Sequence, residues 1–283
     1  MSAAEKADLD RILCHPSLSS EGTRYWWPGQ AHAYQLPPEG DWQTWVIRAG
    51  RGSGKTRAGA EWVRGQAERD AGARIALVGA TSADVRDVMI EGPSGILSIS
   101  PDWFRPDYEP TRRRLRWPNG ATATTFSAEE PDRLRGPQHS GAWCDELAAW
   151  TKPETFDQLL FGMRVGSNPQ VLVTTTPRPT KALKDILAHP RTVETRGSSY
   201  DNRAHLAPGF FDAILRRYEG TRLGRQEILA EILEDVEGAL WCRDVIRYRA
   251  LDALPETSWL NVPSTDASAT ATAPTFAGDI TTG

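Results

Sequence analysis

The sequence predicts an α/β domain in which a mostly parallel central sheet is flanked by helices. Two observations support this prediction. Short apolar runs alternate with longer helical patterns between Trp45 and Thr195, and this alternation is typical of parallel sheets with helical crossovers. A glycine-rich segment, residues 49–56, joins the first apolar run to the first helical pattern. The chain has 283 residues, of which 39% are hydrophobic and 25% charged, as expected for a soluble globular core.

The glycine-rich segment has the pattern of a phosphate-binding loop. It follows the apolar run Trp45–Ile47 and opens into a helical pattern over residues 56–70, and strand, glycine-rich loop, Lys-Thr and helix is the order that such a loop needs. Its glycines let successive backbone N–H groups face phosphate oxygens, and the helix adds its N-terminal dipole. Lys55 is expected on the β- and γ-phosphates and Thr56 on Mg²⁺.

One position of the loop departs from the usual pattern. Ala49 stands where the pattern normally begins with glycine. Because alanine avoids positive φ, the entry to the loop is expected to differ slightly. A glycine-rich surface turn is the alternative, but the flanking strand and helix patterns disfavour it. The expected nucleotide-binding residues of the loop are Gly50, Arg51, Gly52, Ser53, Gly54, Lys55 and Thr56.

The other elements alternate along the chain. Strands are expected at residues 74–78, 140–144, 171–176 and 192–195, and helices at residues 83–90, 150–164, 179–188, 208–218 and 222–233. Either Thr81 or Ser82 is expected to cap the helix at 83–90. Prolines break residues 91–110 into loops.

A β-hairpin is expected around Asn119-Gly120, with strands within residues 111–117 and 121–126. The first of these strands carries the strongest local basic patch, formed by Arg112, Arg113, Arg114 and Arg116. This patch has two interpretations: contact with nucleic-acid phosphates, or a solvated sheet edge that discourages aggregation. The net charge is −4, so any DNA contact must come from local patches.

Two adjacent carboxylates, Asp145 and Glu146, follow the strand predicted at residues 140–144. Open α/β sheets bind ligands at the carboxyl ends of their strands. Asp145 is expected to hold Mg²⁺ together with Thr56. Glu146 is expected to point the other way from the strand and to polarise a water for attack on the γ-phosphate.

Two further segments have candidate roles at the same site. Thr174, Thr175 and Thr176 end a strand that is expected between the loop strand and the acid strand, where their hydroxyls sense the γ-phosphate. The alternative is a threonine-rich strand end without a special role. The aromatic and proline-rich lead-in at residues 24–38 is expected either to form a floor under adenine, with Gln35 reading the base edge, or to pack its tryptophans on the domain surface.

Cysteine content and hydropathy limit the protein class. The cysteines Cys14, Cys144 and Cys242 are few and far apart, which suits a reducing compartment and argues against a disulfide framework or a zinc site. No apolar run approaches the roughly 18–20 residues of a membrane span, and the polar N-terminus is unlike a signal peptide. A cytosolic protein is therefore expected.

Five motifs together resemble the ATPase domain of large terminase subunits, the DNA-packaging motors of tailed phages and gene transfer agents. These motifs are Ala49–Thr56, Arg135–Gln138, Trp143–Glu146, Thr174–Pro177 and Glu237–Trp241. The resemblance runs from about Trp26 to Trp241. It implies an additional-strand, RecA-like P-loop NTPase fold that uses ATP and Mg²⁺ to move double-stranded DNA into a capsid.

The resemblance also implies roles for single residues. Gln35 matches the adenine-side glutamine, and Thr174–Thr176 match the coupling motif. Arg51 and Arg135 are the candidates for an arginine finger, and Arg135 would act on the ATP of a neighbouring subunit in a ring. The alternative for Arg135 is a loop arginine paired with an acid at 129, 130 or 132.

The expected organisation is a helical lead-in at residues 1–25, an ATPase domain at 26–242 and a linker with a low-complexity tail at 243–283. Large terminases normally carry a nuclease domain after the ATPase, and the residues after Trp241 do not resemble one, so ATP hydrolysis without DNA cleavage is expected.

The partners implied by the resemblance are double-stranded DNA, a portal protein, a small terminase subunit and further copies of this chain, with no membrane, in the cytoplasm of a host bacterium. Two alternatives remain open: another nucleic-acid ATPase such as a helicase, and an inactive remnant that only binds the portal or the small terminase.

Overall fold

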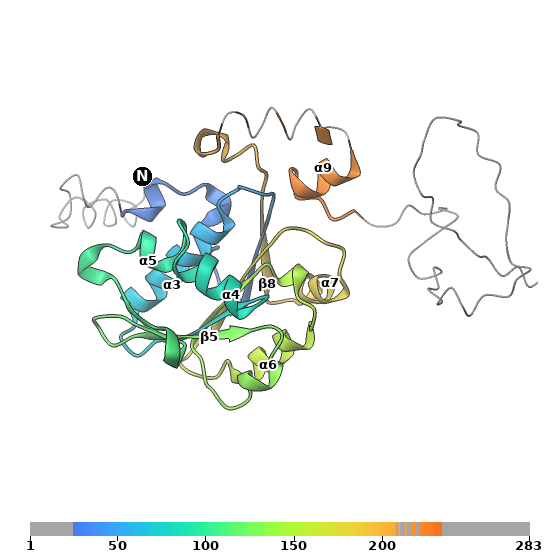
Figure 1. Cartoon of the computed structure of the whole chain (residues 1–283). Coiled ribbons are helices and arrows are strands. Elements are labelled where there is room, and N and C mark those ends of the chain that lie inside the picture. The colour runs from blue at the N-terminus through green and yellow to red at the C-terminus, as the bar shows by residue number, and fades with distance from the viewer. Residues whose placement is uncertain (1–24, 208, 210–212, 214–216, 219–220, 234–283) are drawn as a thin grey trace, which may run out of the picture. The chain divides into compact units, whose positions relative to one another are not determined.

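The computed structural model describes residues 25–207, 209, 213, 217–218 and 221–233 (Figure 1). Several sequence predictions lie wholly or largely outside these residues: the lead-in at 1–25, the helix at 208–218, the motif Glu237–Trp241, and the tail with its boundary at 242. The chain divides into one compact unit that ends at Leu233 and a second that begins at Glu234. The sheet and the candidate site both lie in the first unit.

An eight-stranded sheet forms the centre of this unit, with the strand order β3-β4-β5-β2-β6-β7-β1-β8. The strands are β1 (Thr44–Ala49), β2 (Arg74–Gly79), β3 (Asp107–Glu109), β4 (Arg114–Arg116), β5 (Thr122–Ser127), β6 (Gly141–Asp145), β7 (Gln170–Thr175) and β8 (Thr192–Gly197). The six strands from β5 to β8 in this order are parallel. The mostly parallel sheet predicted from the alternating pattern is confirmed.

The two strand pairings at one side of the sheet are antiparallel. β4 pairs with β5, and β3 pairs with β4. The hairpin predicted around Asn119-Gly120 is therefore confirmed as β4 and β5. The short strand β3 falls in a segment that the prolines predicted to be loop only, because three residues paired to a neighbour leave no periodic signal in the sequence.

Alternation along the strands divides the core into two layers. On one face, Trp45, Ile47 and Trp143 pack with the apolar side of the helix that follows the phosphate loop. On the other face, Val46 and Cys144 pack with a second apolar cluster. Neighbouring residues of a strand point to opposite faces, so both faces of a parallel sheet must be apolar and covered.

Helices cover both of these faces (Figure 1). The α-helices are α3 (Lys55–Arg69), α4 (Ser82–Asp84), α5 (Ile96–Ile99), α6 (Glu154–Gly162), α7 (Lys181–Ala188) and α9 (Arg222–Glu227), and α4 continues as a π-helix, η3 (Val85–Ile90). α3, α5 and η3 pack on the face of Trp45, whereas α6 and α7 pack on the face of Val46.

Short 3-10 helices connect these elements. They are η1 (Trp27–Gly29), η2 (Ala33–Gln35), η4 (Asp102–Phe104), η5 (Pro110–Arg112), η6 (Pro131–Leu134), η7 (Leu147–Ala149) and η8 (Arg203–His205). None of the helices in the described residues is long and apolar enough to cross a bilayer.

Helix boundaries differ from the sequence predictions at three places. The helix predicted at 150–164 begins only at Glu154, because Pro153 occupies its N-cap. The helix predicted at 222–233 ends at Glu227, and Ala230 beyond it has a left-handed backbone with φ 57°. The helix predicted at 179–188 begins at Lys181, capped by the hydroxyl of Thr180. By contrast, a cap is expected at either Thr81 or Ser82, and Thr81 is the residue that caps the helix.

Candidate active site

The carboxyl ends of β1, β6 and β7 meet at one edge of the sheet, as parallel strands require. β7 lies between β1 and β6, which confirms the order expected for the threonine-rich strand. A cavity of about 920 Å³ opens at this edge, and its lining includes the phosphate loop, both carboxylates and Thr176. The topology therefore gathers most of the predicted site in one place.

The phosphate loop has the backbone that its glycines predict. Positive φ falls on Gly52 (70°) and Gly54 (84°), and Gly54 is the N-cap of α3. Ala49 is the buried last residue of β1 and needs no positive φ. The alanine at the first position of the pattern is therefore compatible with this loop.

Tyr34 and Gln35 contact the loop from one side. The Tyr34 hydroxyl donates a hydrogen bond to the Ser53 carbonyl oxygen at 2.5 Å. The Gln35 amide nitrogen donates to the carbonyl oxygens of Ser53 at 3.1 Å and Gly54 at 3.3 Å, and its oxygen accepts from the backbone N–H of His32 at 2.9 Å. Gln35 is buried, and both ends of its amide are bonded to backbone.

The segment after β8 contacts the loop from another side. Ser199 donates its hydroxyl to the Arg51 carbonyl oxygen at 2.6 Å, and Asn202 donates its amide to the Gly52 carbonyl oxygen at 2.6 Å. The backbone N–H of Arg51 donates to the carbonyl oxygen of Glu227 at 2.8 Å. Side chains and backbone far along the chain thus fix the loop.

Sequence reasoning missed these contacts. The Ser199–Asn202 segment has the composition of a polar turn, and Glu227 falls within a predicted helix, so the local pattern gives no signal of a contact with the loop.

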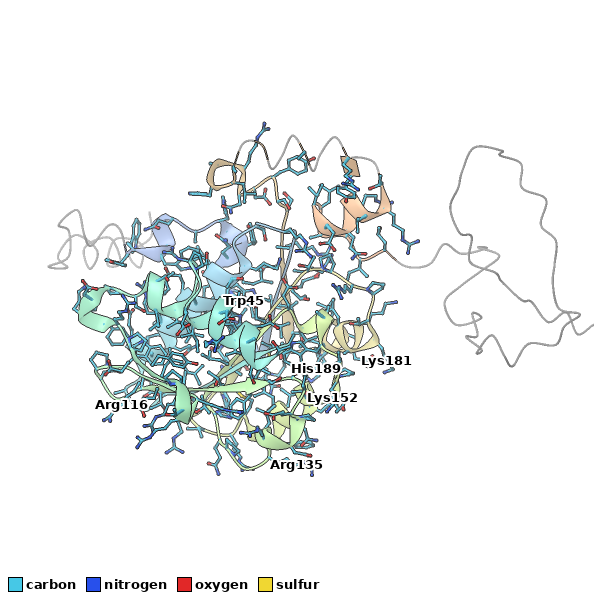
Figure 2. All side chains as sticks on the ribbon, viewed as in Figure 1. Trp45, Arg116, Arg135, Lys152, Lys181 and His189 are labelled. Atoms are coloured by element: carbon cyan, nitrogen blue, oxygen red, sulfur yellow. The ribbon has the colours of Figure 1, made fainter. Side chains whose placement is uncertain are left out.

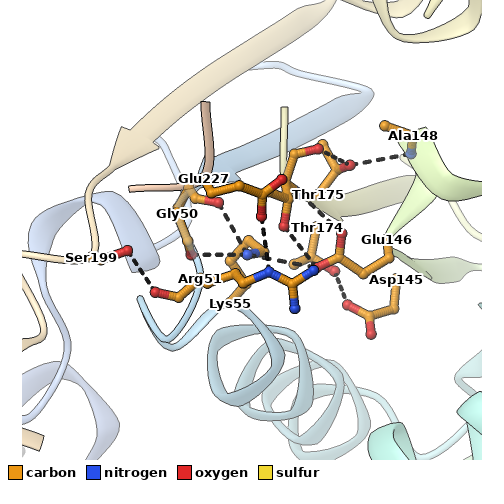
Figure 3. A network of polar contacts seen from close by, with 12 residues as sticks. Gly50, Arg51, Lys55, Asp145, Glu146, Ala148, Thr174, Thr175, Ser199 and Glu227 are labelled. Carbon is orange, nitrogen blue, oxygen red and sulfur yellow. Dashed lines mark hydrogen bonds and ion pairs between the residues drawn. The ribbon is translucent and has the colours of Figure 1, made fainter. Parts of the chain in front are cut away.

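Lys55 lies under the loop, close to one of the two acids. Its Nζ donates hydrogen bonds to the carbonyl oxygens of Ala49 and Gly50, each at 3.0 Å. The same nitrogen is 3.6 Å from a carboxylate oxygen of Glu146. The side chain is 7% exposed, so its charge acts in a poorly solvated environment where it attracts anions strongly. Figure 3 shows this network.

Glu146 reaches the cavity through an unusual backbone. It follows the last residue of β6 and has φ 48°, in the left-handed region that few side chains adopt. Its carboxylate accepts hydrogen bonds from the backbone N–H of Thr176 at 3.0 Å and from the Thr176 hydroxyl at 3.1 Å. Strand alternation predicts that Glu146 points away from Asp145, but this turn brings both carboxylates to the same cavity.

Asp145 is the buried member of the pair. Its carboxylate accepts a hydrogen bond from the Thr174 hydroxyl at 2.6 Å, and Thr174 in turn accepts one from the Trp143 indole N–H at 2.8 Å. Burial, and next the nearby charge of Glu146, raise the pKa of Asp145 to about 7. A carboxylate buried in this way is stabilised in its charged form by a cation.

The residues expected to hold Mg²⁺ fit that ion by their chemistry. Asp145 and Thr56 both line the cavity and present oxygen donors. No cluster of three or more metal-ligating side chains occurs among the described residues. Mg²⁺ needs no such cluster, since it is commonly bound by one or two carboxylates together with water and substrate phosphates.

The comparisons with known proteins agree with this geometry. The family model described as "Terminase large subunit, T4likevirus-type, N-terminal" matches residues 46–247. The chain belongs to the large terminase family. No curated protein matches the chain.

Solved large terminases share the fold at low identity. The ATPase domain of the Thermus phage P74-26 large terminase has a TM-score of 0.57 and 19% identity, over 72% of this chain and 94% of that one. The large terminase of a second thermophilic bacteriophage, in complex with ADP, has a TM-score of 0.56 and 18% identity, over 74% of this chain. The match covers 52% of that second protein, so this chain spans about half of its length. The same protein has also been solved with ATP-γ-S.

The two arginine-finger candidates of this terminase domain lie in different places. Arg51 lines the cavity, and its Nε is 2.9 Å from a carboxylate oxygen of Glu227. Arg135 does not line the cavity of its own chain. Figure 2 labels Arg135 at the lower edge of the view. Its side chain is 67% exposed, pairs with Asp132 at 3.2 Å and donates to Gln158 on α6 at 3.3 Å. Of the acids expected as alternative partners for Arg135, Asp132 is the one it contacts.

Three of the four arginines of the terminase hairpin have a carboxylate partner among the described residues, and Arg116 has none there. Arg112 and Arg114 pair with Glu109, at 3.2 Å and 3.0 Å, and Arg113 pairs with Glu130 at 3.3 Å. These pairs lie on β3, β4 and the adjoining turns, at the side where the sheet ends. Two carboxylates, Glu109 and Glu130, face four arginines, so the patch keeps a net positive charge. A charged sheet edge and a nucleic-acid surface both remain as interpretations.

Proposed function

We propose that this domain hydrolyses ATP and that, as part of a DNA-packaging motor, it couples hydrolysis to translocation of double-stranded DNA into a viral or gene-transfer-agent capsid. The observation that carries the proposal is the meeting of Lys55, Asp145 and Glu146 at one cavity below a phosphate loop. Family membership supports the same function. Portal protein, small terminase and further copies of this chain are the proposed partners.

The residues around the cavity have separate roles in this proposal. The backbone N–H groups of the loop and Lys55 bind the β- and γ-phosphates. The Ser53 hydroxyl is buried, lines the cavity and has no hydrogen-bond partner among the described residues, so a phosphate oxygen is a suitable partner for it. Asp145 and Thr56 would hold Mg²⁺, which neutralises charge on the phosphates when it is bound.

Glu146 is the proposed general base. Its carboxylate orients a water for attack on the γ-phosphate and accepts the proton that the water loses. The two hydrogen bonds from Thr176 fix this carboxylate, and because Thr176 directly follows β7, a change at Glu146 is transmitted to the strand end. Thr174 links the same strand to Asp145. This pair of links is the proposed route from hydrolysis to movement.

An ATPase assay with matched variants tests the proposal. Lys55→Ala is expected to abolish turnover by removing phosphate binding. Glu146→Gln is expected to lower kcat by about 10²–10⁴ while ATP binding is retained, because the amide cannot accept the proton. Lys181→Ala and Glu39→Gln change exposed residues outside the cavity and are expected to match the unmodified chain. The absence of turnover in all five proteins would contradict the proposal.

A further inference from the structure

Four cationic side chains line the cavity, and three of them are paired with carboxylates. The four are Arg51, Lys55, Arg57 and Arg178. Arg51 pairs with Glu227 at 2.9 Å, Lys55 with Glu146 at 3.6 Å and Arg57 with Glu61 at 2.7 Å. Arg178 is exposed and has no carboxylate partner within the part of the chain that the structure describes. It is therefore the cavity arginine whose charge is least compensated.

The backbone of Arg178 is restrained on both sides. Pro177 precedes it and Pro179 follows it, and proline both fixes its own φ and limits the residue before it to extended conformations. The carbonyl oxygen of Arg178 accepts a hydrogen bond from the backbone N–H of Thr180 at 2.7 Å, and Thr180 caps α7. The guanidinium is thus attached to a stiff segment.

This segment begins at Thr176, the residue that contacts the proposed general base. Thr176 holds the Glu146 carboxylate with two hydrogen bonds, and Arg178 lies two residues further on, a distance of at most about 7 Å along an extended chain. A cation at this point is next to the place where the terminal phosphate meets the attacking water.

We propose that Arg178 binds the γ-phosphate of the nucleotide held by its own subunit. The proposal rests on the proposed ATPase function and adds a cation that is independent of Arg51 and Arg135. A guanidinium forms paired hydrogen bonds with phosphate oxygens. Because Arg178 joins the end of β7 to the cap of α7, loss of the γ-phosphate releases a contact at the point where the two elements are connected.

Selective loss of triphosphate affinity is the expected signature. In Arg178→Ala, the affinity for ATP-γ-S is expected to fall roughly 10- to 100-fold, in the range of a lost charged hydrogen bond, while the affinity for ADP stays within about threefold. kcat is expected to fall as well. Arg178→Lys keeps the positive charge but cannot form paired hydrogen bonds with a phosphate. Its affinity for ATP-γ-S is expected to lie between those of Arg178→Ala and the unmodified chain. Both affinities are measured by competition against a fluorescent nucleotide.

The matched control is Arg164→Ala, an exposed arginine outside the cavity, and it is expected to behave as the unmodified chain. Equal losses for ADP and ATP-γ-S in Arg178→Ala, or no loss, would overturn the proposal. So would a variant that binds both nucleotides normally and loses only DNA-stimulated turnover, which would assign Arg178 to DNA. If Arg178→Ala does not fold, Arg178→Lys decides in the same way.

The two proposals fail in different ways. If the unmodified chain binds no nucleotide, the proposed function and the role of Arg178 both fall. If the unmodified chain binds and hydrolyses ATP but the Arg178 variants match it, only the role of Arg178 falls.

Discussion

Gln35 is bonded at both ends of its amide to backbone groups of the protein. Two of these bonds go to carbonyl oxygens of the phosphate loop, Ser53 and Gly54, and the third comes from His32. A Cβ at Gly54 would lie 2.5 Å from the Gln35 amide nitrogen, so the close contact between the two residues leaves no room for a side chain at position 54. In this arrangement Gln35 positions the loop, although the resemblance to large terminases implies a role in reading adenine.

The variant Gln35→Leu separates these two roles. Positioning predicts that the affinities for ATP and GTP fall by the same factor, because the loop binds phosphates that both nucleotides share. It also predicts a stability loss of about 1–3 kcal/mol from backbone groups left without partners. The measurements are KM for both nucleotides and chemical denaturation. Gln43→Leu, at a half-buried glutamine outside the cavity, is the matched control. A weaker affinity for ATP with an unchanged affinity for GTP would instead support base reading.

Helix α3 approaches the sheet most closely at Gly59. A Cβ at Gly59 would lie 2.1 Å from the ring of Trp143 on β6, so this helix position admits glycine alone without displacement of the tryptophan. The Trp143 indole N–H donates to Thr174, and the Thr174 hydroxyl donates to Asp145. The contact between the two elements therefore sets the position of a carboxylate in the site.

Two glycine substitutions in α3 are expected to have opposite effects. Gly59→Ala is expected to destabilise the fold by about 1–3 kcal/mol through overpacking and to lower ATPase activity by displacing Asp145. At Gly65 the nearest atom to an added Cβ is the end of the Arg69 side chain at 3.5 Å, so Gly65→Ala is expected to stabilise by about 0.5–1 kcal/mol through helix propensity. Urea denaturation measures both. Stabilisation by Gly59→Ala would contradict the close approach.

At the scale of the whole molecule, the position of Arg135 has a consequence for assembly. Arg135 contacts Gln158 on α6, and Phe161, 73% exposed, lies three residues later on the same helix. Residues three apart on a helix share a face, so an exposed cation and an exposed aromatic ring are neighbours on this surface. We propose that this surface contacts another subunit and that Arg135 acts at the cavity of that subunit.

A mixing experiment tests whether Arg135 acts between subunits. Arg135→Ala and Glu146→Gln are each expected to be nearly inactive alone. In a mixed ring, about a quarter of the interfaces combine an intact Arg135 with an intact Glu146, if the subunits assemble at random through a head-to-tail contact. Activity above that of either variant is therefore expected.

The control replaces the second partner with the double variant Arg135→Ala/Glu146→Gln, which offers no intact arginine and is expected to give no recovery. If mixing the single variants yields only the average of their separate activities, the arginine does not act in trans.

The residue pattern predicts the phosphate loop, the order of strands and helices, and the placement of two acids after a buried strand. Each of these rests on a local signal. The glycine spacing at 50–54 sets the loop conformation, and short apolar runs mark buried strands whatever lies around them. The pattern does not predict the start of α6 at Glu154 or the end of α9 at Glu227. A proline at the N-cap and a left-handed residue beyond the last turn change helix boundaries without changing the hydrophobic periodicity.

The support of the site depends on contacts that form only in the folded chain. Glu146 enters the cavity because a left-handed turn overrides strand alternation and Thr176 holds the carboxylate. Ser199 and Asn202 bond the phosphate loop from positions 148 and 150 residues further along the chain. Almost any polar side chain can donate a hydrogen bond to a backbone carbonyl oxygen, so the residue type does not specify such a contact. These contacts depend instead on which strands are neighbours in the sheet. No residue pattern specifies them, so only the folded arrangement of β1, β7 and β8 makes them visible.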